Sequence, residues 1–447
     1  MDTDVEETPS ASENPRKFTT AFSSRFQDTK AYSVFRHRDF RLIWTSAFLS
    51  FIGSFIQIVA EGYLVFQLTH RNDSLAWVFA CNALPVTVFG PFAGAISDTM
   101  DRRKVLIFTQ TTFAIGALYL AAATYFGFVQ YWQILVVATI LGTVNSIDMP
   151  TRQAIISKVV PPEDLAAAIP INAMTFNLAR LIGPPIGGLL NTAIGPDACY
   201  FVNGLSYFAL VFAALAVRAD LRALKRDAQP IVDLVKEGFL YTMRDRRLRA
   251  IFLLESAVSL FGLFYITQMA AIVEQLIMPG RSDNEVKAAL AIAYSTVAIG
   301  TLTSLFVVTW MSHLPIKRWV LRIAVTLMGV GLLLLSIARQ DWMFYAVFAL
   351  LGLGAIAIFN TCNQLFQALS PDRLRGRVLS MHIWALSGVG PFGTIGFGYL
   401  AQQFGLRTAF LVGGVLILLT ALGAWLSRKG VGQVDTRYVG ADGTVAA

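Results

Sequence analysis

The feature that most restricts the fold of this chain is a series of twelve apolar stretches that contain almost no charged residue. Each is about twenty residues or longer, which is the length an α-helix needs to cross roughly 30 Å of hydrocarbon. Inside a bilayer every backbone N–H and C=O must be hydrogen-bonded within the protein, so the stretches are predicted to be helices. They span residues 40–68, 75–97, 105–127, 132–155, 166–194, 197–217, 250–275, 288–311, 319–337, 343–368, 379–402 and 408–427.

The composition supports this interpretation. The 447 residues are 55% hydrophobic and only 14% charged, with a mean hydropathy of +0.59. An average soluble domain is about 25% charged. A surface helix of a soluble protein also carries a polar stripe at the helical period, and segment 411–426 has none. The sequence therefore predicts an all-α, multi-pass membrane protein and excludes a soluble helical one.

The basic residues are distributed unevenly between the two sides of the predicted helices. If both termini are cytoplasmic, 28 of the 36 Lys and Arg residues lie on that side, three lie within helices, and five lie on the opposite side. This bias is the positive-inside rule, so the net charge of +8 reflects topology and not a nucleic-acid partner. We expect a protein of the bacterial plasma (inner) membrane with both termini cytoplasmic. The five opposite residues are Arg71, Arg281, Lys287, Arg339 and Arg407.

The two ends of the chain differ in character from the apolar stretches. Residues 1–35 are rich in Ser, Thr, Asp and Glu and lack the apolar core of a signal peptide, so a disordered cytoplasmic arm is predicted. Residues 429–447 are predicted to form a cytoplasmic tail. We expect the protein to act as a monomer surrounded by membrane lipid.

The two halves of the chain match each other at an offset of 209 residues. Segment 51–53 (FIG) aligns with 260–262 (LFG), and 162–165 (PEDL) aligns with 371–374 (PDRL). After a two-residue gap, Gly183 and Pro184 align with Gly390 and Pro391. An internal repeat is predicted, with six-helix bundles at 36–217 and 250–428. The charged segment 218–249 between them is predicted to be a cytoplasmic linker that contains an interfacial helix.

Two sequence runs carry a resemblance to a known family. Residues 148–190 (DMPTRQ…IGGLL) and 371–381 (PDRLRGRVLSM) are similar to signatures of the transmembrane secretion effector branch of the major facilitator superfamily. The superfamily resemblance covers residues 35 to 428. It implies twelve helices in two repeats related by an axis along the membrane normal, with a substrate site between them at mid-membrane. The branch includes enterobactin exporters and macrolide efflux pumps.

The segment 94–104 (GAISDTMDRRK) resembles the superfamily motif Gly-x-x-x-Asp-Arg-x-Gly-Arg-Arg/Lys, with Thr99 and Asp101 as departures. The resemblance implies that Asp98 faces the N-terminal end of the helix at 379–402, a favourable charge–dipole contact. It also implies that Arg102 reaches an acidic group such as Asp148. A conformational latch on the cytoplasmic side is therefore expected to involve Gly94, Asp98, Arg102, Arg103 and Asp148.

The predicted helix at 166–194 contains Gly183, Pro184, Gly187 and Gly188, which resemble the Gly-Pro-x-x-Gly-Gly element of drug–proton antiporters. Ala179, Gly183 and Gly187 form a small-residue face that permits close helix packing. Proline interrupts the backbone hydrogen bonds of the helix. Without the resemblance, these residues indicate packing and bending only; with it, export is favoured over import.

Ionisable residues within predicted helices are costly to place in lipid, so they are functional candidates, and four of them are considered first. Glu61 is the first choice for a proton-carrying carboxylate, and the alternative is a structural one. Arg180 is expected to pair with Glu61 or Asp148, or to face an anionic substrate. Asp148 and Arg152, four residues apart, are expected to pair with each other and to contribute to the latch or to contact substrate.

Further polar residues on the predicted cavity helices are candidate substrate contacts, although most such groups simply bond neighbouring helices. Glu255 and Glu274 lie near opposite ends of the helix at 250–275, where side chains extend to the membrane surface. His382 follows a basic loop and is expected at the interface. The candidate substrate contacts are Gln57, Asn177, Asn360 and Gln364.

No enzymatic chemistry is predicted. The sequence has no phosphate-binding loop and no nucleophile elbow. The three widely spaced cysteines, Cys81, Cys199 and Cys362, form no metal motif or disulfide framework. We therefore expect neither metal nor cofactor, and energy from a proton gradient. The predicted function is proton-driven efflux of an amphipathic small molecule, siderophore or macrolide-like, by alternating access; the alternative is a lipid or lysolipid flippase on the same fold.

Overall fold

The computed structural model describes residues 31–222, 231–311, 314, 316–371, 374–427 and 430–434. Within these ranges the side chains of residues 31–32, 90–99, 166, 169, 170, 173, 231–234, 309 and 375 are not described. The N-terminal arm up to residue 30, residues 223–230 of the linker and the tail from 435 lie outside the described residues. So do the side chains of Gly94 and Asp98.

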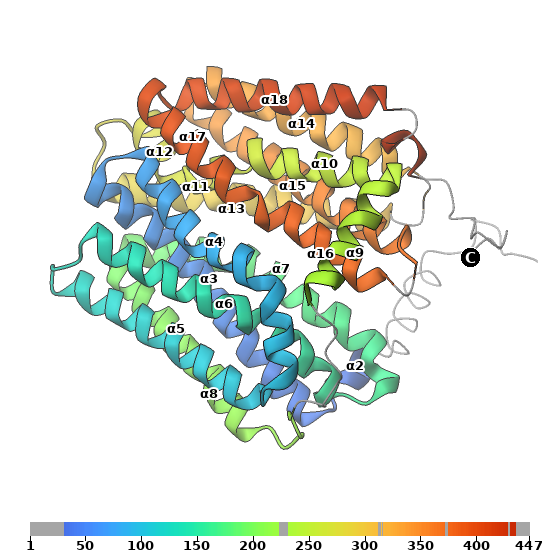
Figure 1. The fold of residues 1–447 in the computed structure, drawn as a ribbon. Helices are drawn as coiled ribbons and strands as arrows, with labels where there is room; N and C mark the ends of the chain where they lie inside the picture. Colours follow the sequence, from blue (N-terminus) through green and yellow to red (C-terminus); the bar gives the residue numbers. More distant parts are fainter. Residues whose placement is uncertain are drawn as a thin grey trace, which may run out of the picture.

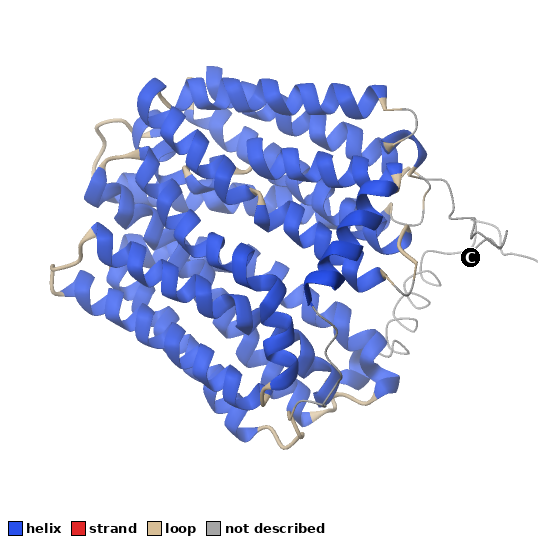
Figure 2. Ribbon diagram, in the orientation of Figure 1, coloured by secondary structure: helices blue, strands red, loops and turns tan. Residues whose placement is uncertain are grey.

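The described residues form helices and contain no strand (Figures 1 and 2). Ten helical segments are long and apolar enough to cross a membrane. The two remaining predicted spans coincide with α4 and α7, whose side chains are described only in part. The prediction of an all-α membrane protein is confirmed.

The helices of the first part of the chain are α2 (Ala31–Val34), α3 (Arg38–Thr69), α4 (Asn72–Thr99), α5 (Arg102–Tyr125), α6 (Tyr131–Val159), η1 (Pro162–Asp164), α7 (Leu165–Ala193) and α8 (Pro196–Ala216). Those of the second part are α9 (Ile231–Arg244), α10 (Arg246–Phe261), α11 (Phe264–Thr267), α12 (Met269–Ile272), η2 (Val273–Ile277), α13 (Asp283–Trp310), α14 (Lys317–Ile337), α15 (Asp341–Ala368), α16 (Arg375–Ile383), η3 (Trp384–Gly388), α17 (Gly390–Phe404), α18 (Leu406–Leu426) and η4 (Val431–Gln433).

The long helices pack in two groups, which occupy the lower and upper parts of Figure 1. In the first group α3 packs against α7 and α8, α4 against α6, and α5 against α6 and α8. In the second group α13 packs against α15, α14 against α15 and α18, and α10 against α17 and α18. Glycine residues allow some of these helices to lie close together. For example, a β-carbon on Gly142 of α6 would collide with the backbone of Asn82 of α4.

The groups meet mainly where α7 packs against α13 and where α4 packs against α17. We name the two sides of the molecule by α3. The terminal side is where α3 begins at Arg38, and the far side is where it ends at Thr69. Gly188 of α7 lies against Ala291 of α13, and Gly398 of α17 lies against Ala76 of α4. Both contacts lie in the far-side half of their helices.

The segment between the groups contains α9, which lies beside α16 at the terminal side (Figure 1). Glu237 of α9 forms an ion pair with Arg377 of α16, and Gly238 lies against the backbone of Arg377. Asp245 ends this segment and caps α10, because its carboxylate accepts hydrogen bonds from the backbone N–H of Arg247 (2.7 Å) and Leu248 (3.1 Å). The segment predicted as a linker thus contains one described helix, α9.

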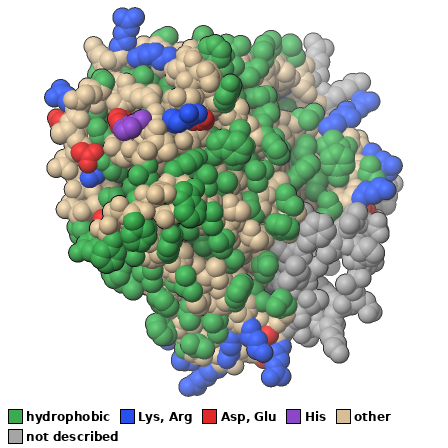
Figure 3. Space-filling view, turned by 60° about the vertical axis from the view of Figure 1, so that its left-hand side comes forward, with side chains coloured by type: hydrophobic (Ala, Val, Ile, Leu, Met, Phe, Trp, Pro, Cys, Tyr) green, Lys and Arg blue, Asp and Glu red, His purple; other side chains and the backbone are tan. Residues whose placement is uncertain are grey.

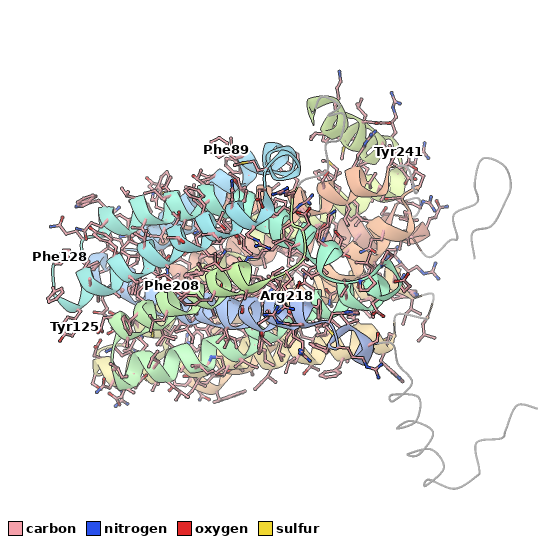
Figure 4. The ribbon with its side chains drawn as sticks, turned by 90° about the horizontal axis from the view of Figure 1, so that it is seen from below. Phe89, Tyr125, Phe128, Phe208, Arg218 and Tyr241 are labelled. Carbon is pink, nitrogen blue, oxygen red and sulfur yellow. The ribbon has the colours of Figure 1, made fainter. Side chains whose placement is uncertain are left out.

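The outer surface suits a bilayer. Figure 3 shows hydrophobic side chains covering the side of the molecule, with charged side chains gathered in separate patches at its ends. In Figure 4, Tyr125 and Phe128 lie at one end of the helices, whereas Arg218 and Tyr241 lie toward the other. Exposed apolar side chains along the helices include Phe108, Ile115 and Phe212. An apolar surface this extensive is unfavourable in water and favourable in lipid.

Candidate functional site

The carboxylate of Glu61 lies in the far-side half of α3 and begins a polar network between α3 and α8. Glu61 Oε2 accepts a hydrogen bond from Gln57 Nε2 at 3.2 Å. Gln57 Oε1 in turn accepts one from Asn203 Nδ2 of α8 at 2.6 Å. Asn203 is fully buried, so its side-chain amide has no access to water and must be hydrogen-bonded within the protein. Sequence reasoning did not select Asn203, although it is a polar residue within an apolar span.

The network continues toward the terminal side. Asn203 Nδ2 donates to the hydroxyl of Tyr207 at 3.2 Å, and that hydroxyl lies 3.0 Å from Ser54 Oγ. One turn earlier on α3, Ser50 Oγ accepts a hydrogen bond from Arg152 Nη2 at 3.5 Å. Polar groups therefore extend along α3 from Glu61 to Arg152. Ser50 and Glu61 are eleven positions apart on this helix, or about 16 Å at 1.5 Å per residue.

Asp148 and Arg152 form a buried ion pair on α6, as the sequence predicted. Arg152 Nε lies 2.6 Å from Asp148 Oδ2, and Asp148 is only 2% exposed. Asp148 Oδ1 also accepts hydrogen bonds from Thr109 Oγ1 (2.5 Å) and Gln110 Nε2 (2.7 Å) of α5. The Arg152 guanidinium lies 4.9 Å from the ring centroid of Phe51. The carboxylate is thus satisfied within the first helix group.

Arg180 of α7 has no ion-pair or hydrogen-bond partner among the described residues. Both pairings that the sequence left open are absent from this conformation, because Asp148 is engaged by Arg152 and Glu61 by Gln57. The guanidinium is within electrostatic range of Tyr265 of α11. The Tyr265 hydroxyl is buried and makes no hydrogen bond with the described part of the chain. An arginine and a phenol from opposite helix groups thus stand near each other without partners.

The other candidate substrate contacts are dispersed. Asn360 and Gln364 lie one turn apart on α15 and are half-buried, and Asn177 is half-buried on α7. Among the described residues, none of the three is hydrogen-bonded to Glu61 or Arg180. Gln57 is the only one of the four candidate polar contacts that the structure connects to Glu61.

The residues expected to form the latch lie near the junction of α4 and α5. Asp101 caps α5 by accepting a hydrogen bond from the backbone N–H of Arg103 at 2.9 Å. Arg103 Nη2 donates to the carbonyl oxygens of Val217 (2.6 Å) and Ala219 (3.2 Å), which follow α8. Arg102 is buried, and its backbone N–H donates to the Leu221 carbonyl. In this conformation the Asp148 carboxylate is bonded to Arg152, Thr109 and Gln110, and not to Arg102.

The glycines of α7 lie at close helix contacts. A β-carbon on Gly183 would collide with Phe55 of α3, and one on Gly187 would lie 2.9 Å from the Cα of Ile56. Gly188 faces the opposite way, against Ala291 of α13. Pro184 is buried within the same continuous helix. One short motif therefore holds α7 against its own group and against the other group.

The expectations for Glu255 and His382 were wrong. Glu255 was expected to extend to the membrane surface, but it is 0% exposed. His382 was expected at the interface, but it is 5% exposed. His382 Nδ1 lies 2.9 Å from a carboxylate oxygen of Glu255. The sequence placed them in different helices, and the packing of α10 against α16 brings them together. Glu274 does lie near the far-side surface, where it accepts a hydrogen bond from Gln67 Nε2 at 2.9 Å.

Most hydrogen bonds between the two helix groups lie at the far side, where no motif was predicted from the sequence. The backbone N–H of Asn72 donates to Gln402 Oε1 at 2.8 Å, and Gln268 Nε2 donates to the Asn72 carbonyl at 3.0 Å. Tyr63 donates a hydrogen bond to Asp283. These contacts, with that of Gln67 and Glu274, hold α3 and α4 against the segment from α11 to η2, against α13 and against α17. The far side of the molecule is closed by polar bonds.

The structure offers no alternative chemistry in its described part. Within the described residues there is no group of three or more His, Cys, Asp or Glu side chains that could hold a metal ion. The three cysteines are free and well separated, and Cys199 and Cys362 are buried. Ionisable residues within membrane-spanning helices are functional candidates, and the site described above consists of such residues.

The comparisons with known proteins agree with this arrangement. The chain is 24% identical to the staphyloferrin A transporter of Staphylococcus aureus, over 87% of this chain and 96% of that protein. It is 22% identical to macrolide efflux protein A of Streptococcus pyogenes, over 86% of this chain and 94% of that protein. The fold is similar to the crystal structure of the nucleoside transporter NupG, with a TM-score of 0.68 at 14% identity over 87% of this chain and 98% of that one.

The match to a family model extends over nearly the whole described structure. The model of the transmembrane secretion effector family matches residues 29–436, from before α2 to beyond η4. This range includes the helices that carry Glu61, Asp148, Arg180 and Glu255. The chain is a membrane transporter that belongs to the transmembrane secretion effector family of the major facilitator superfamily.

Proposed function

We propose that this transporter is a proton-driven exporter of an amphipathic small molecule, siderophore-like or macrolide-like, and that it works by alternating access. The main observation behind the proposal is the set of partners of the Glu61 carboxylate. Its carboxylate lies within a membrane-spanning helix and is hydrogen-bonded to the neutral amide of Gln57, with no cationic partner among the described residues. Such a group gains and loses a proton more readily than a carboxylate held by an arginine. The names of the siderophore and macrolide relatives support the substrate class.

Arg180 is the proposed contact for an anionic group of the substrate. Arg180 has no ionic or hydrogen-bond partner among the described residues, whereas Arg152 is held by Asp148 and Arg322 donates to the backbone carbonyls of Ala424 and Ser427. A guanidinium binds carboxylate with two parallel hydrogen bonds, so it suits an acidic ligand better than a neutral one. Tyr265 from the other helix group supplies a hydroxyl nearby. In this proposal Gln57, Asn177, Asn360 and Gln364 supply the remaining polar contacts.

We also propose the twelve-helix, two-repeat organisation, with bundles at 36–217 and 250–428. Close glycine contacts in one group have counterparts in the other. Gly142 lies against Asn82, and Gly352 against Val297; Gly204 lies against Leu118, and Gly414 against Leu333. Each pair of glycines is separated by 210 residues. The agreement between sequence offset and helix contact supports a repeat.

The conformation supports alternating access with the termini in the cytoplasm of a bacterial inner membrane. Most of the described hydrogen bonds between the two groups lie at the far side, as expected for a state closed to the outside; the contact of Thr87 Oγ1 with the Ser387 carbonyl at 3.5 Å lies nearer the middle of the helices. In the proposed cycle the far-side bonds break while the latch of Gly94, Asp98, Arg102, Arg103 and Asp148 forms at the terminal side. The protein would act as a monomer in this cycle.

The close seams between the groups support a solute over a lipid. A lipid flippase needs a lateral opening between α7 and α13 or between α4 and α17. In the far-side half, Gly188 and Ala291 leave no room for a side chain between α7 and α13, and Gly398 and Ala76 do the same at the other seam. Efflux of a soluble amphiphile is therefore the function we propose.

The test is transport into inside-out vesicles that contain the purified protein. With an acidic lumen, the vesicles should accumulate staphyloferrin A or the macrolide erythromycin, used as the two probes. Collapse of the pH gradient with nigericin should abolish the accumulation. Protein-free vesicles and vesicles with equal internal and external pH serve as controls. Accumulation of a probe that does not change when the gradient is collapsed would rule out proton coupling.

A further inference from the structure

The buried pair of Glu255 and His382 has no part in the function argued so far. Glu255 lies on α10 and His382 on α16, and Nδ1 of the imidazole is 2.9 Å from each carboxylate oxygen. The side chains are 0% and 7% exposed for Glu255 and His382, respectively. The pair is therefore removed from water within the second helix group, in the terminal-side half of both membrane-spanning segments, Arg246–Thr267 and Gly376–Phe404.

The surroundings of the pair offer little compensation for charge. The Phe366 ring lies 5.7 Å from the imidazole, centroid to centroid. The hydroxyls of Ser256 and Thr361 are buried and have no hydrogen-bond partner in the described structure. Glu255 Oε1 also lacks a well-directed hydrogen bond. A buried carboxylate with an unsatisfied oxygen is costly unless it is protonated or its partner is charged.

The titratable groups of the packed elements leave His382 as the partner of Glu255. From α15, the Cys362 thiol is within electrostatic range of Glu255. On α9 and α16, Glu237 and Arg377 form an ion pair with each other. Among the described residues, no lysine or arginine lies within ion-pair distance of Glu255. The first group differs, because there Asp148 is paired with an arginine that is always charged.

This difference gives the pair a variable charge. A carboxyl and an imidazole together are neutral when they hold one proton and anionic when they hold none. Burial disfavours the anion, so the conformation described here favours the form with one proton. A conformation that admits water to the pair lowers this cost and favours release. Histidine is the side chain whose protonation ordinarily changes near neutral pH.

The pair lies next to a point where a membrane-spanning helix is interrupted by a π-helical turn. Directly after α16, the chain forms the π-helical turn η3, and Ser259 of α10 donates a hydrogen bond to the Leu386 carbonyl within it at 2.7 Å. Ser259 is one turn after Glu255, so α10 holds the α16–η3 segment by two adjacent polar contacts. Single π-helical turns occur frequently at functional sites, and interrupted helices are places where a helix bends.

From this geometry we propose that Glu255 and His382 form a second proton-binding site, whose occupancy is coupled to the opening of the far side. The inference rests on the proposed function, because a proton-driven exporter has a use for such a site. In the far-side-closed state the pair holds one proton. Loss of that proton leaves a buried anion and shifts the population toward the other conformation, in which α10 and the α16–η3 segment separate.

The test measures conformation and not transport. Spin labels at Arg71→Cys and Arg281→Cys, both exposed at the far side, report the distance between the two helix groups in protein held in lipid nanodiscs. The native cysteines are replaced by alanine in every sample. The parent should change from a short to a long distance as the pH rises from about 5 to about 9. Glu255→Gln should lose this transition, and His382→Gln should shift its midpoint by about one pH unit or more.

The matched control is His37→Gln. His37 and Asp164 form an imidazole–carboxylate pair of similar length, 2.7 Å, but it is partly exposed at the terminal side. This variant should keep the parent's transition. Thermal unfolding of each variant checks its fold, and His382→Gln keeps the test valid if Glu255→Gln does not fold. A parent distance that does not change with pH, or variants that keep the parent's midpoint, would overturn the inference.

The two proposals fail in different ways. If gradient-driven accumulation is absent in vesicles while the labelled distance still titrates through Glu255 and His382, proton-driven export is wrong and the proton site stands. If accumulation is present while the pH-dependent change in label distance is the same in both variants as in the parent, the export proposal stands and the second proton site is wrong.

Discussion

Gln57 and Glu61 lie one turn apart on α3, and the amide of the first donates a 3.2 Å hydrogen bond to the carboxylate of the second. Because the same Gln57 accepts a hydrogen bond from the buried Asn203, its amide is held in one orientation. The carboxylate is therefore positioned by a neutral group that does not oppose its protonation. This relationship distinguishes Glu61 from Asp148, which is bound by a cation and two further donors.

Glu61→Gln is expected to uncouple transport from the proton gradient. The amide imitates a carboxyl that always carries its proton, so the carrier can complete its conformational cycle but cannot release a proton. The variant should exchange labelled probe across vesicles at equal concentrations, yet fail to accumulate it against a gradient. Its exchange rate should also lose the pH dependence of the parent. The measurement is probe uptake with and without an acidic lumen.

Glu285→Gln is the control for this prediction, since Glu285 is an exposed carboxylate at the far side. It should accumulate probe like the parent. Gradient-driven accumulation by Glu61→Gln with the parent's pH profile would exclude Glu61 as the coupling carboxylate.

The helical fold could be predicted from the sequence because backbone polar groups in a bilayer must be hydrogen-bonded within the protein. A run of about twenty apolar residues satisfies its backbone in a bilayer by forming a helix. The predicted runs are helical in the structure, although 250–275 and 379–402 are divided into shorter helices and π-helical turns. The pairing of Asp148 with Arg152 was also predictable, since residues four apart on a helix are neighbours. The contact of Glu255 with His382 was not, because it depends on which faces of two distant helices meet. For the same reason the sequence did not reveal the link from Gln57 to Asn203.

Removal of one partner from the Asp148–Arg152 pair is expected to destabilise the protein. Asp148→Asn leaves a guanidinium in a site where water is excluded, and loss of one member of a buried ion pair costs about 3–5 kcal/mol. Arg152→Ala should have a similar effect on the carboxylate, although Thr109 and Gln110 still donate to it. The measurement is the thermal unfolding midpoint in detergent. A double variant less destabilised than the sum of the single ones would demonstrate the coupling.

Gly187→Leu and Gly183→Leu are expected to block the transport cycle. Their missing side chains allow α7 to lie against Ile56 and Phe55 of α3, and a leucine there would force the helices apart. The initial uptake rate should fall by about tenfold or more, because even a displacement of about 1 Å can reduce the rate of a protein-catalysed process by a large factor. Gly396→Leu on α17 is the matched control, because a β-carbon there meets no other atom. Normal uptake by both α7 variants at equal expression would contradict the packing argument.

The latch prediction concerns the terminal side in the opposite conformation. Asp98→Asn and Arg102→Ala should slow transport while leaving membrane insertion intact, because the motif at 94–104 is expected to hold the two groups together when the far side opens. Lys104→Ala, which alters an exposed neighbour, should transport normally. Uptake rates at matched expression are the measurement. Parent-like rates in both motif variants would remove the latch from the transport cycle.

Arg180 should determine the preference for anionic substrates. It lies within α7 without an ionic partner in the described structure, near the unpaired hydroxyl of Tyr265. A hydrogen bond between charged groups contributes about 1.5–3 kcal/mol. Since about 1.4 kcal/mol corresponds to a factor of ten, Arg180→Gln should raise the KM for the carboxylate-bearing probe staphyloferrin A roughly ten- to hundredfold. Arg180→Lys should recover part of the loss, because it keeps the charge but not the planar fork.

The comparison between probes separates substrate binding from a structural role of Arg180. If the guanidinium binds an anionic group, Arg180→Gln should affect the KM for staphyloferrin A and leave that for erythromycin, which has no carboxylate, nearly unchanged. Arg71→Gln, which removes an exposed far-side arginine, controls for net charge. If instead Arg180 only stabilises the fold, the uptake of both probes should fall together and the thermal unfolding midpoint should fall with them. Equal losses for the two probes would therefore refute the anion-binding role, because erythromycin offers the guanidinium no carboxylate to bind.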